Sequence, residues 1–167
     1  MRRASGLYQV ALVFAILTAG STCATAASEC RDKGIYWSVA LSPDNTHIAA
    51  AAGGKHGCIE IINTQSGHRT SLRTKGGPVH TLAYSRGGQH LYLGHGRGIV
   101  TVIDTSDHRL VDEIGGVSPF PKISLGKDEG YLATGGQSFT ARLIELKTKS
   151  VIQEFGNHRT VTGIEIS

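Results

Sequence analysis

Short stretches of alternating apolar and polar residues dominate this sequence from residue 35 onward. Ile59 and Ile61 flank one polar residue, and Val100 and Val102 repeat this spacing. A period of two is typical of β-strands, because successive side chains point to opposite faces of a sheet. Gly, Asn, Asp and Ser residues gather between the stretches, as expected for tight turns. The pattern therefore predicts an all-β fold for this part of the chain.

The strand pattern recurs at a nearly fixed interval. Residues 38–45 align with residues 81–88, less closely with residues 122–129, and again with residues 163–167. The offsets between the first residues are 43 (81 − 38), 41 (122 − 81) and 41 (163 − 122). A repeat of about 40–45 residues is the length of one four-stranded propeller blade.

Each repeat divides into four short strands, named a to d in chain order. The expected strands are 36–42, 47–52, 58–63 and 69–73, then 79–85, 90–94, 99–104 and 109–114, then 121–125, 131–134, 141–146 and 150–155. One further inner strand is expected at 161–166. We predict an incomplete β-propeller of three four-stranded antiparallel blades plus one extra strand. The predicted blades are 35–76, 77–116 and 117–157, with a partial fourth at 158–167.

The N-terminal residues have the three-part layout of an export signal. Arginines at positions 2 and 3 give a positive start, residues 10–17 are uninterruptedly apolar, and Ala24-Thr25-Ala26 fits a signal-peptidase site. The alternative is a membrane anchor, but the apolar stretch is shorter than the ~20 residues that cross a bilayer. We predict a helical signal peptide at 1–26, a short N-terminal segment at 27–34, and a secreted or periplasmic protein that is not membrane-inserted after cleavage.

Charge gives no support for a nucleic-acid partner. The formal net charge is +4, from 17 Lys and Arg against 13 Asp and Glu. Removal of Arg2 and Arg3 with the signal leaves 15 − 13, or +2, and no dense basic run remains. A basic footprint for a phosphate backbone is therefore not expected.

Export also changes the interpretation of the three cysteines. Cys23 leaves with the signal peptide, so Cys30 and Cys58 remain as one even pair. In an oxidising compartment this pair is compatible with a Cys30–Cys58 disulfide, and the alternative is two unpaired thiols. Their spacing alone does not decide whether the Cα atoms lie within bonding range.

Three segments carry a resemblance to a known superfamily. Residues 39–45 (VALSPDN) resemble the strand-a signature of propeller repeats, and residues 91–105 resemble the bacterial YVTN repeat. Residues 155–158 (FGNH), followed by Val161, resemble the join between WD repeats. The chain thus resembles the WD-repeat and YVTN-repeat β-propeller superfamily over roughly residues 35–167. This resemblance implies stacked four-stranded blades.

The chain departs from that family in two ways. Ile-Asn, Ile-Asp and Ile-Glu stand in place of the Trp-Asp pair, and the expected structural aspartate is replaced by His56, Arg97 and Ser138. The hydrogen-bond network of WD blades is therefore expected to be absent, leaving sheet pairing and apolar packing. Family propellers close with about seven blades. Three explanations for the small number stay open: a fragment of a longer reading frame, assembly with a copy or another chain, and an open arc.

The sequence shows no arrangement typical of catalysis. There is no Gly-x-Ser-x-Gly motif, and the glycine pairs open no helix that would cradle a phosphate. His56 and His95 could converge from adjacent blades, but no Asp or Glu has ligand spacing to them, so neither a metal nor a cofactor is expected. Trp37 and Phe120 are candidates for an exposed binding surface or for packing within and between blades.

The resemblance implies binding through the loops between strands b and c. The candidate binding residues in these loops are His56, His95, Arg97, Gln137 and Ser138. We expect an exported, non-catalytic module for protein or ligand binding or scaffolding, with a protein partner or self-association completing the propeller. The alternative is a fragment of a periplasmic propeller enzyme, similar to lactonases, amine dehydrogenases or haem d1 nitrite reductases.

Overall fold

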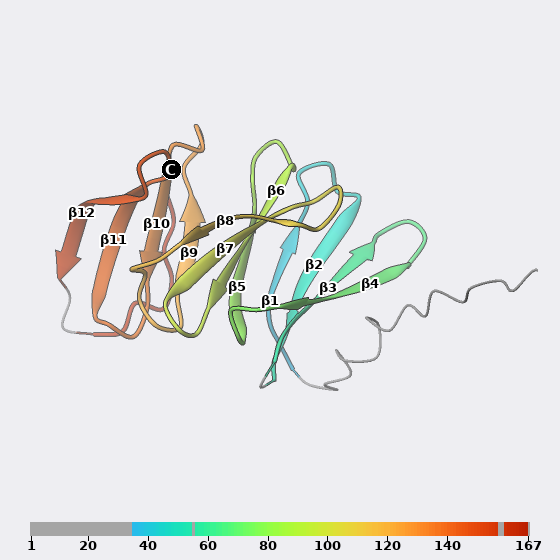
Figure 1. The fold of residues 1–167 in the computed structure, drawn as a ribbon, viewed down its shortest axis with the longest axis horizontal. Coiled ribbons are helices and arrows are strands. Elements are labelled where there is room, and N and C mark those ends of the chain that lie inside the picture. The colour runs from blue at the N-terminus through green and yellow to red at the C-terminus, as the bar shows by residue number, and fades with distance from the viewer. Residues whose placement is uncertain (1–34, 55, 157–158, 167) are drawn as a thin grey trace, which may run out of the picture.

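The computed structural model describes residues 35–54, 56–156 and 159–166, and within them the only regular elements are β-strands (Figure 1). The predicted signal peptide at 1–26 and the segment at 27–34 lie outside the described residues. The strands are β1 Tyr36–Leu41, β2 His47–Ala52, β3 Gly57–Asn63, β4 Arg69–Thr74, β5 Val79–Tyr84, β6 His90–His95, β7 Ile99–Asp104, β8 Leu110–Ile114, β9 Lys122–Leu125, β10 Tyr131–Gly135, β11 Thr140–Glu145 and β12 Ser150–Gly156. No helix in the described part of the chain is long and apolar enough to span a bilayer.

The strands form three four-stranded antiparallel sheets, which confirms the predicted all-β blades. Blade 1 has the order β1-β2-β3-β4, blade 2 the order β5-β6-β7-β8 and blade 3 the order β9-β10-β11-β12. Strand order in each blade therefore follows chain order, as successive hairpins require. The sheets stand side by side in Figure 1, with β1, β5 and β9 as neighbouring inner strands.

Equivalent turns have the same backbone conformation in each blade. The turn between strands a and b has a residue with positive φ at Asn45 (60°), Gly88 (76°) and Glu129 (56°). These three residues each lie seven positions after the aligned repeat start (45 − 38, 88 − 81, 129 − 122). Gly and Asn tolerate this left-handed conformation best. Glu129 shows that the turn keeps its geometry even where neither of these residues is present.

Two hydrophobic clusters join the blades. Between blades 1 and 2, Ala49 and Ala51 of β2 pack near Leu91 and Leu93 of β6, and all four are fully buried. A second cluster between blades 2 and 3 includes Val100. The alanines leave space on blade 1 for the larger leucines of blade 2. Burial of a leucine stabilises by about 1.5–3 kcal/mol, so these contacts contribute much of the stability of the blade stack.

The outer faces of the end blades are open. On β1, Val39 is 65% exposed and Leu41 is 53% exposed, whereas the leucines on β6 are fully buried. On β12, Val151 and Phe155 are also exposed. Among the described residues only blade 2 has a neighbouring blade on each side, which explains why its strands β6 and β7 are buried along most of their length.

The predicted extra strand at 161–166 does not form. Residues 159–166 have no strand pairing, because no second strand lies beside them among the described residues. The segment nevertheless lies against blade 3: the Val161 amide donates to the Gly136 carbonyl at 3.1 Å, and the Ile166 amide donates to Ser124 Oγ at 3.1 Å. Leu82 donates to Ser38 Oγ in the same way between blades 1 and 2, also at 3.1 Å.

Candidate functional site

The loops between strands b and c meet the loops that link one blade to the next. The Gly96 amide donates to the Pro78 carbonyl at 3.0 Å, and the Gln137 amide donates to the Pro119 carbonyl at 3.1 Å. Both kinds of loop therefore lie at one end of the molecule, the lower end in Figure 1. We call this end the loop face. It carries all five of the predicted binding residues.

The sequence predicted His95 to be a binding residue in an exposed loop, but the structure places it elsewhere. It is the last residue of β6, fully buried. Its Nδ1 lies 2.9 Å from the Gly77 carbonyl oxygen, and its Nε2 lies 2.8 Å from Thr101 Oγ1. Burial lowers the pKa of His95, while the Gly77 carbonyl and Glu113 act in the opposite direction. His95 thus braces the loop face from inside and does not reach a ligand on its surface.

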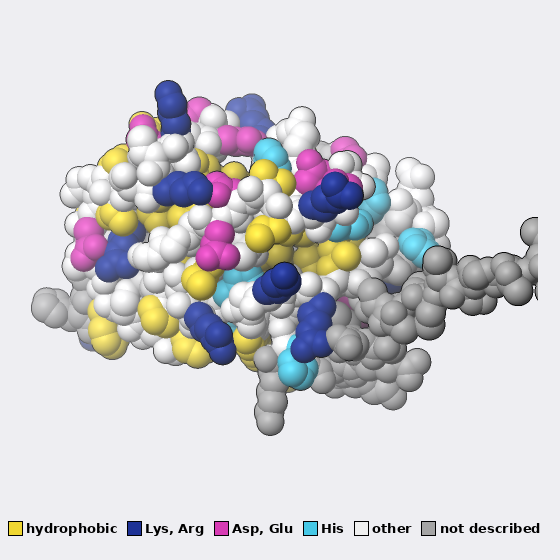
Figure 2. Space-filling view, viewed as in Figure 1, with side chains coloured by type: hydrophobic (Ala, Val, Ile, Leu, Met, Phe, Trp, Pro, Cys, Tyr) yellow, Lys and Arg dark blue, Asp and Glu magenta, His cyan; other side chains and the backbone are white. Residues whose placement is uncertain are grey.

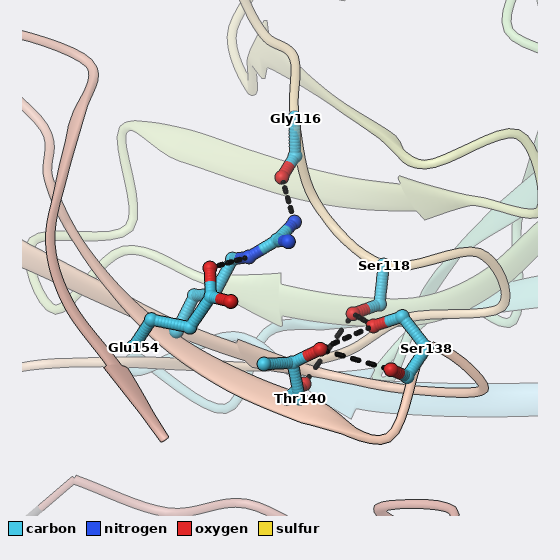
Figure 3. A network of polar contacts seen from close by, with 6 residues as sticks. Gly116, Ser118, Ser138, Thr140 and Glu154 are labelled. Carbon is cyan, nitrogen blue, oxygen red and sulfur yellow. Dashed lines mark hydrogen bonds and ion pairs between the residues drawn. The ribbon is translucent and has the colours of Figure 1, made fainter. Parts of the chain in front are cut away.

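Ser138 also has a bracing role, at the junction of blades 2 and 3 (Figure 3). Its hydroxyl forms a hydrogen bond with the hydroxyl of Ser118, which is fully buried, and lies 3.2 Å from Thr140 Oγ1. Beside this network, Arg142 donates to the Gly116 carbonyl at 2.6 Å and to Glu154 at 2.7 Å. These contacts bind the linker between the two blades to blade 3.

His56 and Arg97 are brought to one junction, between blades 1 and 2. His56 Nδ1 lies 3.3 Å from an Arg73 guanidinium nitrogen, and both residues line a cavity of about 430 Å³ that also contains Lys75. A neighbouring cavity of about 360 Å³ contains Lys75, Arg73 and Arg97. The structure thus brings several basic side chains together at this junction, whereas the sequence had predicted only His56 and Arg97 there. Gln137 is exposed in the loop of blade 3 and does not line either cavity.

An aromatic row crosses all three blades. The rings of Trp37 and His80 are stacked with centroids 4.3 Å apart, and Phe120 meets the edge of His80 at 4.6 Å. Burial lowers the pKa of His80, with smaller contributions from Lys122 and His95. His80 was not among the predicted residues, although it precedes the aligned repeat start by one position, as Trp37 does. The row joins the inner strands β1 and β5 and the linker that leads into β9.

A larger cavity, of about 720 Å³, lies between blades 1 and 2 at the opposite end of the strands. Its polar side chains already bind each other: Asp44 accepts from Ser42 and Thr46, and the Asn63 amide lies 3.4 Å from His47 Nε2. The hydrogen bonds from Ser42 and Thr46 lower the pKa of Asp44 to about 2. This hydrogen-bonded end is therefore a weaker candidate for a ligand than the loop face.

Metal-binding chemistry has no support in the described residues. No three His, Cys, Asp or Glu side chains gather as ligands within residues 35–54, 56–156 and 159–166. Cys58 is buried at the start of β3 and is disulfide-bonded. Cys30 lies outside the described residues, so the Cys30–Cys58 pairing stays a prediction.

No protein-family model matches the chain, and no curated protein matches its sequence. Solved structures do match it: the WD40 repeats of RRP9 and the structure of U3-55K, each with a TM-score of 0.71 over 80% of this chain. The fold is that of a partial WD40-like β-propeller. The sequence identity is 14% to each, so the likeness concerns the fold alone. The chain spans 42% of the RRP9 structure and 43% of U3-55K, about two fifths of each propeller.

Proposed function

We propose that this chain is an exported, non-catalytic propeller module that binds a protein partner through its loop face. The WD40-like fold supports a repeat module for protein interaction. One observation carries the choice of surface: the side chains of Lys75 and Arg97 are exposed there and form no ion pair or hydrogen bond with any described residue. Exposed polar side chains on loops that a rigid scaffold positions are typical of binding surfaces.

Several other cations of the blades have acidic partners. Arg69 binds Glu60 at 3.2 Å, Arg142 binds Glu154, and Lys149 binds Asp112. Lys75 and Arg97 both line one cavity and have no such partners among the described residues. Two unpaired cations at one place repel each other, and an acidic partner would remove that repulsion. The loop face is therefore the best-supported interaction surface in the described part of the chain.

Export is supported by the charged start, apolar stretch and small-residue site within residues 1–26. The test is to express the full chain in a cell with a secretory pathway and to determine the mass of the secreted product. We expect an N-terminus after Ala26 or Ala27. Retention of the full-length chain in the cytosol would contradict export.

Binding through the loop face is tested by site-specific photo-cross-linking. A photoreactive amino acid replaces Gln137, which is exposed on the loop face, and in a control replaces Lys147, which is exposed in the turn before β12. We expect a discrete protein adduct from position 137 and none from position 147. Adducts of equal yield from both positions, or from neither, would contradict the proposed surface.

A further inference from the structure

The groove between blades 1 and 2 combines an apolar floor with a basic end. Its walls come from β3 and β4 on one side and β7 and β8 on the other, and its volume is about 360 Å³, within the usual range for ligand sites. Ile59 and Ile103 are buried at its base, and Leu110 is 60% exposed at its edge. In the view of Figure 2, hydrophobic side chains lie near the middle of the molecular surface, and Lys, Arg and His side chains lie below them.

The charges that line the groove are unequal. Lys75 and Arg97 line the groove with one carboxylate, that of Glu113, so the basic groups outnumber the acidic one even when Arg73, which contacts His56, is left out. Lys75 and Arg97 have no ion-pair partner among the described residues, as noted above. An occupant with negative charge beside its apolar groups would therefore be complementary to the groove.

The strands at the rim favour a peptide over a small organic anion. β4 and β8 are the outermost strands of blades 1 and 2, so one edge of each backbone has no strand partner among the described residues. Unpaired edges hydrogen-bond extended peptides, and alternate peptide side chains then point the same way. A fatty acid or an aromatic acid has no backbone groups to use these edges.

We propose that this groove binds an extended acidic segment of a partner protein. Apolar side chains of the segment enter the groove above Ile59 and Ile103, and its carboxylates lie against Lys75 and Arg97. This inference rests on the proposed function, because the basic end of the groove, at Lys75 and Arg97, belongs to the loop face. It predicts a sequence in the partner that alternates acidic and apolar residues, since one face of a strand must be apolar.

Three fluorescein-labelled peptides of about eight residues, a typical strand length, test the chemistry. One alternates Asp or Glu with Leu, the second alternates Lys with Leu, and the third alternates Asp or Glu with Ser. Fluorescence anisotropy with the purified protein at low salt should give a dissociation constant on the order of 10 µM for the first peptide. Each of the other two should bind at least about tenfold more weakly, because each lacks one half of the complementarity.

Variants of the protein locate the site. The double variant Lys75→Glu, Arg97→Glu should weaken binding of the acidic-apolar peptide roughly tenfold or more. Leu110→Ser should weaken it about fivefold through lost apolar contact. The matched control Lys147→Glu reverses an exposed cation outside the groove and should leave affinity unchanged. Circular dichroism checks folding, and if the double variant unfolds, loss of wild-type binding with rising salt tests the charge contribution instead.

Several results would overturn the inference. One is failure of the acidic-apolar peptide to bind, and another is equally tight binding of the lysine peptide. A third is a folded double variant that keeps its full affinity for the acidic-apolar peptide. If the double variant unfolds, the overturning result is wild-type binding that does not weaken with salt. Tighter binding of dodecanoate at the same residues would assign the groove to a small amphiphile. Dimerisation that the double variant abolishes would assign it to a second copy, which also overturns the peptide. If these peptides fail while the cross-link from position 137 persists, the proposed function stands and only this inference falls.

Discussion

The two junctions between blades brace equivalent loops with different side chains. Between blades 1 and 2, the buried imidazole of His95 joins the Gly77 carbonyl to Thr101. The equivalent position in blade 3, fourteen residues after the repeat start (95 − 81, 136 − 122), is Gly136. A Cβ added to Gly136 would lie 2.5 Å from the Pro119 carbonyl oxygen, so the backbone of the linker occupies that space instead.

The second junction is braced by hydroxyl groups, through Ser118, Ser138 and Thr140. The linker before blade 3 leaves no room for a side chain at Gly136, so the ring that His95 supplies in blade 2 has no counterpart there, and the hydroxyl of Ser138 supplies the hydrogen bond instead. The buried polar groups of a loop need hydrogen-bond partners, and different side chains can supply them. These loops are therefore hydrogen-bonded although the chain lacks the WD motif residues. The sequence-based expectation of sheet pairing and apolar packing alone was incomplete.

The largest expected effect is at the first junction. His95→Ala would leave a cavity and unpaired groups at Gly77 and Thr101, so we expect a loss of about 3 kcal/mol in the free energy of unfolding. Urea denaturation followed by circular dichroism measures it. The matched control is His68→Ala, an exposed histidine in the turn before β4, which should change stability by less than about 0.5 kcal/mol. Equal losses in both variants would show that His95 has no special bracing role.

A smaller effect is expected at the second junction. Ser118→Ala removes one buried hydroxyl but leaves Ser138 paired with Thr140. We expect a loss of about 1.5 kcal/mol in the same urea measurement. Ser150→Ala, at the exposed start of β12, serves as the control and should be near neutral. A loss at Ser118 as large as that at His95 would contradict the difference between the junctions.

The two junctions should also differ in their response to pH. Burial lowers the pKa of His95, and of His80, below the value of about 6.5 expected in the unfolded chain. Below that pH the unfolded chain binds protons that the folded chain does not, so the free energy of unfolding falls as the pH falls. Urea denaturation at about pH 7.5 and 5.5, either side of that pKa, measures this fall. His95→Gln should reduce it, whereas Ser118→Ala should leave it unchanged.

The smallest effect concerns an ion pair on the surface of the second junction. Lys149 binds Asp112 across blades 2 and 3, and their side chains are 46% and 36% exposed. Lys149→Ala should cost about 0.5 kcal/mol or less, because water and salt screen such pairs. The unfolding midpoint of the variant should also depend less on salt than that of the wild type. A cost above that of Ser118→Ala would mean that surface charge, and not the buried hydroxyls, holds blade 3 to blade 2.

Most of the strands could be predicted from the sequence. The predicted bounds of β2 and β7 match the structure, and other strands differ by only one residue at an end, as at β9 and β10. This agreement has a local cause: side-chain alternation and turn residues act within a few neighbouring positions. The segment at 161–166 failed as a strand despite its local pattern, because strand pairing also needs a second chain segment beside it.

The site was less predictable than the fold. The repeat alignment correctly placed His56 and Arg97 in equivalent loops, but it gave no sign that Lys75 joins them or that His95 is buried. The burial of a loop residue depends on how closely the neighbouring blade and its linker approach that loop. The alternation of apolar and polar residues along a single strand carries no information on this distance. The sequence alone therefore determined three blades and their turns through local backbone preferences. Only the packing of one blade on the next decided which loop residues brace the junctions and which are exposed on the loop face.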